Sequence, residues 1–326
     1  MSWSKMLMLL AISILLSSCG FIQRIGIGTT SPIFYKASNG MQAQNDFENF
    51  EKSVLGTLML TEGLLSLKPG DMNFLATLTK GYAGYAFAVN ETYFLDDLYA
   101  EKDKSVHKDA AVVNYSKAMD YGLQYLAKEG LTYQMLQKSV SDKEGVVGIL
   151  EDKMDDDMRD LEVVLFTAQS LASMINLQKD NMTLVSQLPI AKGMFDWVCS
   201  KKPDIHYGAC DIFFASYEAG RPSMLGGNPE KGKEIFLKLI QKQPHNWLVR
   251  VAYIQFYVIP QSEDGEYNSQ KFHLEKFTEL HRKQKIWMPE NKAAADPAFG
   301  EDMMRVYQTL AIKRFEYIKK HEKDLF

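Results

Sequence analysis

Apolar residues recur at helical spacing along this chain from about residue 45 to its end. The clearest segment runs from about 74 to 95, where a stripe of large apolar residues lies beside a stripe of small ones that includes Gly81 and Gly84. Small side chains let a neighbouring helix approach closely, which offsets the low helix propensity of glycine. We find no run with the alternating pattern of a half-buried strand. The pattern therefore predicts an all-α fold.

Helix start and stop signals divide this region into segments. We expect helices over 45–67, 74–95, 110–127, 156–177, 188–200, 204–217, 229–243, 246–259, 267–284 and 301–323, with one or two short helices between 130 and 153. Asn228-Pro229-Glu230 is a strong start, because Asn caps a helix, Pro fits its first turn and Glu favours its positive end. The prolines at 69, 203 and 244 each follow a helix end.

The spacing of these prolines favours helical repeats. Pro203 and Pro244 are 41 residues apart, close to one tetratricopeptide unit of about 34 residues plus a loop insertion. The 134 residues from Pro69 to Pro203 leave room for about four units, or three with long loops. We expect helical-hairpin, tetratricopeptide-like repeats that form a compact superhelical shell. A generic helical bundle is the alternative.

The first nineteen residues have the layout of a signal peptide: Lys5, an apolar run from Leu7 to Leu16, then small residues and Cys19. The apolar run is too short to span a bilayer well. Leu16-Ser17-Ser18-Cys19 resembles the bacterial lipobox, which implies cleavage before Cys19 and its lipidation. We expect a signal peptide over 1–18, a lipidated Cys and a Gly/Ser/Thr-containing tether over 19–44, and a helical domain over 45–326. The implied location is the periplasm, anchored by lipid to a membrane, with the outer membrane favoured.

Charge and composition exclude several classes of protein. The net charge of the 326 residues is −4, and no basic stripe is visible, so nucleic-acid binding is disfavoured. The six histidines lack zinc spacing, and the acidic run over 151–160 lacks the glycine turn of a calcium loop. We find no nucleophile elbow and no phosphate loop. The sequence therefore indicates no cofactor, no metal site and no enzymatic activity.

Cys199 and Cys210 are the cysteines that remain besides Cys19. An oxidising compartment permits a disulfide, and the turn at Pro203-Asp204 brings the two to similar heights if they lie on antiparallel helices. A disulfide also requires the two side chains to face each other. The alternative is two buried thiols that act as small apolar side chains.

Two groups of aromatic residues are candidates for a ligand pocket. The first group is Tyr82, Tyr85, Tyr93 and Phe94, and the second is Trp197, Tyr207, Phe213, Phe214 and Tyr217. Aromatic residues at helical spacing mostly fill the core. An apolar pocket with tyrosine hydroxyls as its polar groups is the alternative.

Four stretches resemble one family. They are Thr61-Glu62-Gly63-Leu64-Leu65 with Gly81-Tyr82-Ala83-Gly84-Tyr85-Ala86, Leu188-Pro189, Tyr207-Gly208-Ala209, and the loop with Arg221, Pro222, Leu225, Gly226, Gly227, Pro229 and Glu230. Together they look like TatT, the tetratricopeptide-like T component associated with tripartite ATP-independent periplasmic (TRAP) transporters. The loop from 221 to 230 has two interpretations. It is a shaped turn in which Gly226-Gly227 supplies positive φ, or a rim for a partner or ligand with Arg221 as its charged tip.

The resemblance implies a periplasmic lipoprotein of helical repeats that forms homo-oligomers, often trimers. It also implies a partner, the solute-binding P component, and an apolar pore or pocket for a small hydrophobic solute. Stacked hairpins make a concave surface suited to binding. The leading hypothesis is thus an accessory component of a TRAP-type uptake system. The alternative is a tethered repeat scaffold for cell-envelope protein assembly.

Overall fold

The computed structural model describes residues 26–290 and 296–326. Cys19 and the expected signal peptide lie outside the described residues. Within these two ranges the chain forms helices, turns and coil but no strand, which confirms the all-α prediction. None of the helices in these ranges combines the length and the apolar character needed to cross a membrane.

An N-terminal helix covers residues 26–38. The α-helices that follow are α2 (Phe47–Leu67), α3 (Met72–Tyr85), α4 (Glu91–Tyr99), α5 (Val106–Lys128), α6 (Tyr133–Ser139), α7 (Gly145–Lys153), α8 (Met158–Leu177), α9 (Met182–Val185), α10 (Leu188–Lys201), α11 (Ala209–Gly220), α12 (Pro229–Lys242), α13 (Leu248–Tyr253), α14 (Ile259–Gln261), α15 (Asp264–Lys285), α16 (Arg305–Lys320) and α17 (Glu322–Leu325). The short 3-10 helices within the described ranges are η1 (Asn39–Ala43), η3 (Ile205–Tyr207), η4 (Ser223–Leu225), η7 (Pro297–Phe299) and η8 (Asp302–Met304). Two π-helical segments, η2 (Ala86–Asn90) and η5 (Ile254–Val258), lie within longer helical runs.

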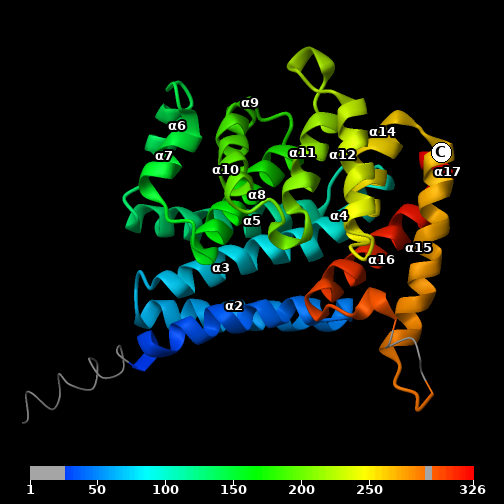
Figure 1. Ribbon diagram of the computed structural model, residues 1–326, viewed down its shortest axis with the longest axis horizontal. Helices are drawn as coiled ribbons and strands as arrows, with labels where there is room; N and C mark the ends of the chain where they lie inside the picture. Colours follow the sequence, from blue (N-terminus) through cyan, green and yellow to red (C-terminus); the bar gives the residue numbers. More distant parts are fainter. Residues whose placement is uncertain (1–25, 291–295) are drawn as a thin grey trace, which may run out of the picture.

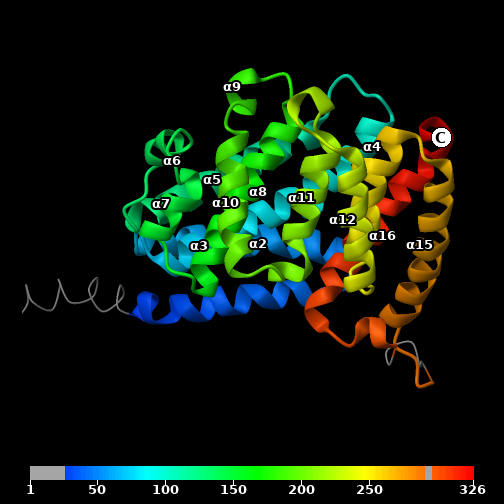
Figure 2. The same ribbon diagram turned by 45° about the horizontal axis from the view of Figure 1, so that its top comes forward.

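The helices are arranged over a lower layer made by the N-terminal helix and α2, which run alongside each other in both ribbon views (Figures 1 and 2). Helix α3 packs on α2, and α5, α8 and α10 pack in turn above it. Two clusters of buried apolar residues fill the molecule. The first lies among α2, α3, α12, α13 and α16, and the second among α3, α5, α7, α8 and α10.

The helix starts follow from local capping chemistry. Asp71 caps α3 by accepting hydrogen bonds from the amides of Asn73 and Phe74, and Asp157 caps α8 in the same way. Asn228 accepts from the amide of Lys231, with Pro229 in the first turn of α12. The start predicted at 228–230 is therefore confirmed.

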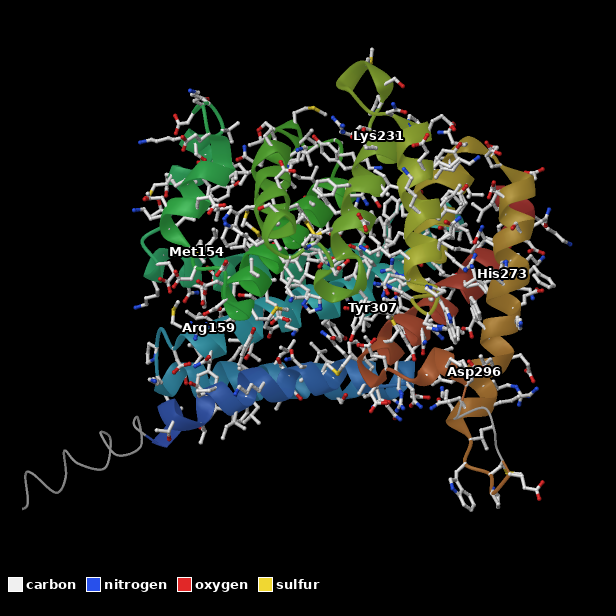
Figure 3. The ribbon with its side chains drawn as sticks, in the orientation of Figure 1. Met154, Arg159, Lys231, His273, Asp296 and Tyr307 are labelled. Atoms are coloured by element: carbon white, nitrogen blue, oxygen red, sulfur yellow. A yellow bond between two sulfur atoms is a disulfide. The ribbon has the colours of Figure 1, made fainter. Side chains whose placement is uncertain are left out.

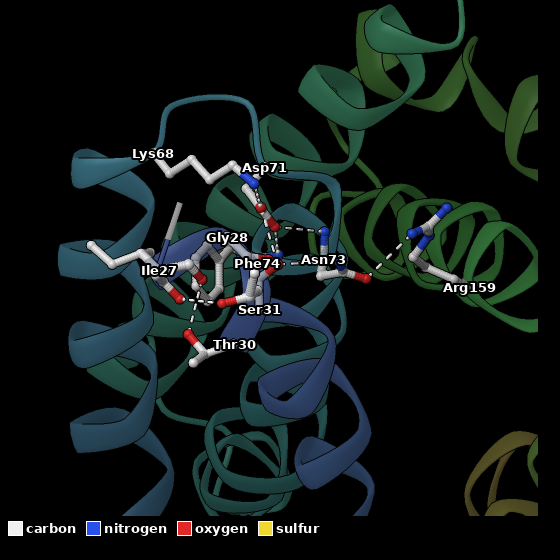
Figure 4. A network of polar contacts seen from close by, with 11 residues as sticks. Ile27, Gly28, Thr30, Ser31, Lys68, Asp71, Asn73, Phe74 and Arg159 are labelled. Carbon is white, nitrogen blue, oxygen red and sulfur yellow. Dashed lines mark hydrogen bonds and ion pairs between the residues drawn. The ribbon is translucent and has the colours of Figure 1, made fainter. Parts of the chain in front are cut away.

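The N-terminal helix differs from the tether that the sequence analysis expects over 19–44. From residue 26 on, this segment is helical and packs on the start of α3 (Figure 4). The hydroxyl of Ser31 donates to Asp71 at 3.0 Å, and the rings of Phe34 and Phe74 meet edge to face. The Ser and Thr residues of this segment favour a tether in the sequence, but in the structure the helix accommodates their hydroxyl groups. Thr29 and Thr30 donate hydrogen bonds to main-chain carbonyls three residues earlier in the same helix.

The chain between α10 and α11 also differs from expectation. A continuous helix over 204–217 is wrong at its start, because His206, Tyr207 and Gly208 have φ values of 47°, 56° and 102°. These are left-handed conformations, which residues other than glycine rarely adopt. Helix α11 therefore begins only at Ala209.

Candidate functional site

Four ionisable side chains meet inside the molecule and form what we call the polar centre: Tyr35, Lys80, Glu162 and His206. Glu162 of α8 is 3% exposed. Its Oε1 atom lies 2.7 Å from Lys80 Nζ of α3 and 2.9 Å from His206 Nε2. The hydroxyl of Tyr35, from the N-terminal helix, donates to Oε2 at 2.7 Å. Elements far apart in the sequence thus converge on one carboxylate.

The electrostatics of the polar centre keep this carboxylate ionised. Burial by itself would raise the pKa of Glu162, but the contacts with His206 and Lys80 outweigh it and lower the pKa to about 2. Burial and the neighbouring Glu162 carboxylate raise the pKa of the Tyr35 hydroxyl far above its ordinary value. At neutral pH, Tyr35 is therefore a hydrogen-bond donor to an anion.

The left-handed turn holds His206 in place. Asn246 donates from Nδ2 to the main-chain oxygen of Tyr207 at 3.0 Å, which fixes the turn from the side of α13. His206 Nδ1 lies 3.4 Å from the hydroxyl of Tyr307, which sits between the lower layer and the helices above it (Figure 3). Backbone strain of this kind persists only where surrounding contacts determine it, and it clusters at functional sites.

A disulfide joins the helices on either side of the strained turn. Cys199, near the end of α10, and Cys210, at the start of α11, are joined, with a Cα–Cα distance of 5.8 Å. Of the two alternatives in the sequence analysis, the structure has the covalent bond. The bond closes a loop that contains His206, Tyr207 and Gly208, so it ties together the two helix ends that present the turn.

An open depression of about 380 Å³ lies beside the polar centre. It is lined by Ala37, Gly40, Met41, Ala43, Gln44, Phe50 and Ser53, from the N-terminal helix, η1 and α2. The short helix η1 has two roles here. Gly40, Met41 and Ala43 line the depression, while Asn39 accepts a hydrogen bond from Lys80 and Gln42 lies 3.5 Å from His206 Nδ1. Residues of η1 therefore contact both the depression and the polar centre.

The nine aromatic candidates do not come together at one place in the structure. Tyr82 and Tyr85 belong to the first apolar cluster, with Tyr93 packed against it, and Trp197 belongs to the second, with Phe94, Phe213 and Phe214 packed against it. The hydroxyls of Tyr82 and Tyr93 donate to Glu62 and Glu51. Tyr207 donates to Glu301, and its ring contacts that of Tyr307 beside the polar centre. None of the nine lines the depression.

The loop from 221 to 230 is a closed turn. The guanidinium of Arg221 lies 3.7 Å from the ring centre of Tyr217 and donates to the carbonyls of Tyr217 and Gly226, so it folds back and is no outward tip. Gly226 has the expected positive φ of 81°, but Gly227 does not. A Cβ atom at Gly227 would lie 2.0 Å from the Arg221 carbonyl oxygen, so glycine is required there for close approach. Glu230 accepts from the Tyr257 hydroxyl at 2.7 Å.

A second buried charge lies at α16. Arg314 is 3% exposed and contacts both π-helical segments, donating to the Phe87 carbonyl in η2 and to the Gln255 side chain in η5. Its Nη2 lies 3.8 Å from Glu91, whose pKa is raised by burial. Segments of π-helix are rare and frequently mark functional positions. These contacts connect the last long helix to the middle of the chain.

Sequence reasoning missed Lys80, Glu162, His206 and Arg314. One signal was available, because Glu162 stands between inward apolar residues of its helix, where a carboxylate requires buried partners. His206 was considered only for zinc spacing. Among the described residues, no group of three or more His, Cys, Asp or Glu side chains is placed to hold a metal ion.

Comparisons with known proteins identify the family. A family model described as "TRAP transporter T-component" (TAtT) matches residues 43–276, well over half of the chain. A search of curated proteins returns no match. The matched range includes α2 through most of α15, with Lys80, Glu162, His206 and the loop from 221 to 230 inside it. The chain therefore belongs to the TRAP transporter T-component family, as its resemblance to TatT predicted.

Proposed function

We propose that this protein is a periplasmic lipoprotein that binds a small hydrophobic or amphipathic solute and exchanges it with the solute-binding P component of a TRAP-type uptake system. Family membership supports the accessory role, since T components belong to transport systems and not to an enzyme family. The observation that carries the solute-binding part is the open depression lined by η1, whose Asn39 and Gln42 also contact the polar centre. The proposal includes lipidation of Cys19 and assembly into homo-oligomers, with a trimer as the expected form.

The depression has the volume of a small-molecule site. Its volume of about 380 Å³ lies in the range of ligand pockets, and its lining offers both polar and apolar atoms to a ligand. Phe50, Met41 and Ala43 offer apolar contact for a hydrocarbon part. Asn39 and Gln42, on the other side of η1, contact Lys80 and His206. If η1 shifted, a polar end of the solute would replace Asn39 and Gln42 as the partner of Lys80 and His206. No covalent bond would be made or broken.

One observation favours the alternative, a tethered repeat scaffold for cell-envelope protein assembly. Tyr82 and Trp197 are at most 2% exposed and fill the two apolar clusters. A filled interior with binding surfaces outside is what a scaffold with protein partners requires. The two functions differ in whether the purified protein carries a small molecule.

The test is native mass spectrometry of the full chain extracted from membranes in mild detergent. Ser53→Trp fills the depression from an exposed position on α2, and Met182→Trp adds the same side chain at α9, away from the depression. We expect a lipophilic molecule in the wild type and in Met182→Trp, and its loss in Ser53→Trp. If all three proteins carry the same amount of the lipophilic molecule, or if none of them carries any, solute binding in the depression is contradicted. The same spectra report the oligomeric state.

A further inference from the structure

The outer face of α2 carries an apolar stripe. Phe50, Val54 and Leu58 form the buried face of this helix, towards α3. Between Lys52 and Lys68, the one charged residue of α2 is Glu62, which is half-buried and pairs with Lys117. The larger apolar members of the stripe are Leu55, Met59, Leu60 and Leu67, with exposed fractions of 37%, 68%, 58% and 44%. Because α3 lies above α2 in Figure 1, the stripe points to the lower side of the molecule.

A second apolar element projects on the same side. The chain leaves α15 with Ile286, Trp287 and Met288, which are 52%, 82% and 60% exposed. This segment extends below the level of α2 in Figure 1. In Figure 3, Asp296 lies near the level of α2, whereas Lys231 at the start of α12 lies towards the opposite, upper side. We call the α2 stripe together with residues 286–288 the lower face.

Basic residues border both parts of the lower face. Lys52 and Lys68 stand at the two ends of the stripe on α2. Arg282 and Lys283 come just before the apolar tip, and both also contact Glu279. Apolar side chains bordered by lysine and arginine are characteristic of surfaces that lie at the boundary between lipid headgroups and acyl chains.

The position of Cys19 restricts what the lower face meets. Gly26, where the N-terminal helix begins, is seven residues after Cys19. A chain of that length spans at most about 25 Å. The N-terminal helix belongs to the lower layer (Figures 1 and 2). A lipid on Cys19 therefore keeps the lower layer, and not the upper end with η4, close to the bilayer.

We propose that the lower face lies on the surface of the bilayer that holds the Cys19 lipid, with Trp287 in the headgroup region. Tryptophan prefers this region because its ring is apolar and its N–H is polar. Burying the stripe and the tip adds a second attachment to the lipid anchor, fixes the orientation of the molecule, and places the depression beside η1 next to the membrane. The inference rests on the lipidation part of the proposed function.

Tryptophan fluorescence tests the placement directly. Trp197 and Trp247 are fully buried and Trp287 is 82% exposed, while Trp3 leaves with the signal peptide. Trp287 is therefore the tryptophan that a quencher outside the fold reaches. The lipidated full-length product is reconstituted in phosphatidylethanolamine–phosphatidylglycerol vesicles whose acyl chains carry bromine, which quenches only tryptophan in contact with lipid.

We expect the wild type to lose Trp287 emission in brominated vesicles and to resist iodide added in the water. Trp287→Phe removes this quenchable signal. Trp287→Phe combined with Met224→Trp puts the reporter on η4, at a position 90% exposed, where iodide and not bromine should quench it.

Vesicle-bound protein whose Trp287 is quenched by iodide and not by bromolipid overturns the proposal. So does shielding of Trp287 that appears only at high protein concentration or with the P component, since the lower face is then a protein interface. If the protein does not float with the vesicles, lipidation of Cys19 itself is contradicted. This outcome differs from that of a vesicle-bound protein whose lower face does not contact the lipid.

Discussion

The guanidinium of Arg314 donates a hydrogen bond to the main-chain oxygen of Phe87 at 2.5 Å. The acceptor belongs to the π-helix η2, and the donor to α16, beyond residue 276, where the family match ends. Because Arg314 also donates to the Thr92 hydroxyl at 3.0 Å, α16 is tied to the middle of the chain by buried polar contacts. The folded domain therefore continues past the matched range and includes α16.

Replacing Arg314 by methionine should destabilise the fold strongly. The change removes a buried cation, leaves Glu91 without its charge partner and leaves the Phe87 carbonyl without this donor. Breaking a buried pair in this way costs about 3–5 kcal/mol. The free energy of unfolding, measured with urea, checks the loss. Lys320→Met on the same helix breaks only an exposed pair with Asp96 and should cost less than about 1 kcal/mol.

A double variant separates charge from packing. With Glu91→Gln added to Arg314→Met, no charge remains buried at this position, so we expect the double variant to lose less than the two single losses added together. Strict additivity of the two losses would show that Arg314 and Glu91 act independently, contrary to the geometry.

Glu162 should make the free energy of unfolding decrease at acidic pH. Its pKa falls from 4.5 to about 2 on folding, so its contribution is fully present above pH 4.5 and is lost as the pH falls to about 2. A difference of that size corresponds to about 3 kcal/mol. In urea titrations at several pH values, the advantage of wild type over Glu162→Gln should be constant near neutrality and shrink below pH 4.5. An advantage unchanged down to pH 2.5 refutes the assignment, and Glu151→Gln, at an exposed pair with Lys201, is the control.

The two glycines of α3 should respond oppositely to alanine. At Gly81 a Cβ atom would lie 2.3 Å from Leu58 Cδ2, inside a packed cluster, so Gly81→Ala should lose about 1–3 kcal/mol through overpacking. At Gly84 nothing lies within 4 Å of the added atom, so Gly84→Ala should gain about 0.5–1 kcal/mol from helix propensity. Thermal unfolding of both variants checks the signs, and losses of equal size would contradict the packing described for Gly81.

Removing the disulfide should loosen the strained turn. The bond between Cys199 and Cys210 spans a sequence separation of 11 residues, and closing a loop of that length contributes about 2–3 kcal/mol. The Cys199→Ser, Cys210→Ser double variant should lose that amount in urea unfolding. Its hydrogen exchange should rise at residues 203–209 before it rises in α8. Exchange that rises evenly over the whole chain would show that the bond does not act on the turn.

Local chemistry explains how much of the fold was predictable. The start of α12 was expected from Asn228, whose side chain caps the helix, and helix α2 was expected over 45–67 from its apolar spacing and the proline at 69. The cap of α3 by Asp71 was not expected. Gly81 was correctly assigned to a close helix contact, but Gly84, in the same stripe, faces open space. Sequence spacing identifies a face of a helix and does not show which part of that face a neighbour covers.

The polar centre was not predictable for a related reason. Its members come from the N-terminal helix, α3, α8 and the turn after α10, and only the folded chain brings them to Glu162. The left-handed conformations of His206 and Tyr207 oppose the intrinsic preference of both residues, and tertiary contacts with Asn246 and Glu162 maintain them. Local sequence preference therefore fails at the candidate site itself.

Co-purification with the P component tests the central claim most directly. The full-length lipidated protein is extracted from membranes in which the candidate P component is co-expressed, and the complex is captured through the T component alone. The account predicts that the P component is retained in stoichiometric amount, together with a lipophilic molecule that Ser53→Trp fails to carry. Capture of the T component without the P component, under conditions in which both are folded, would contradict its proposed role in a TRAP-type uptake system.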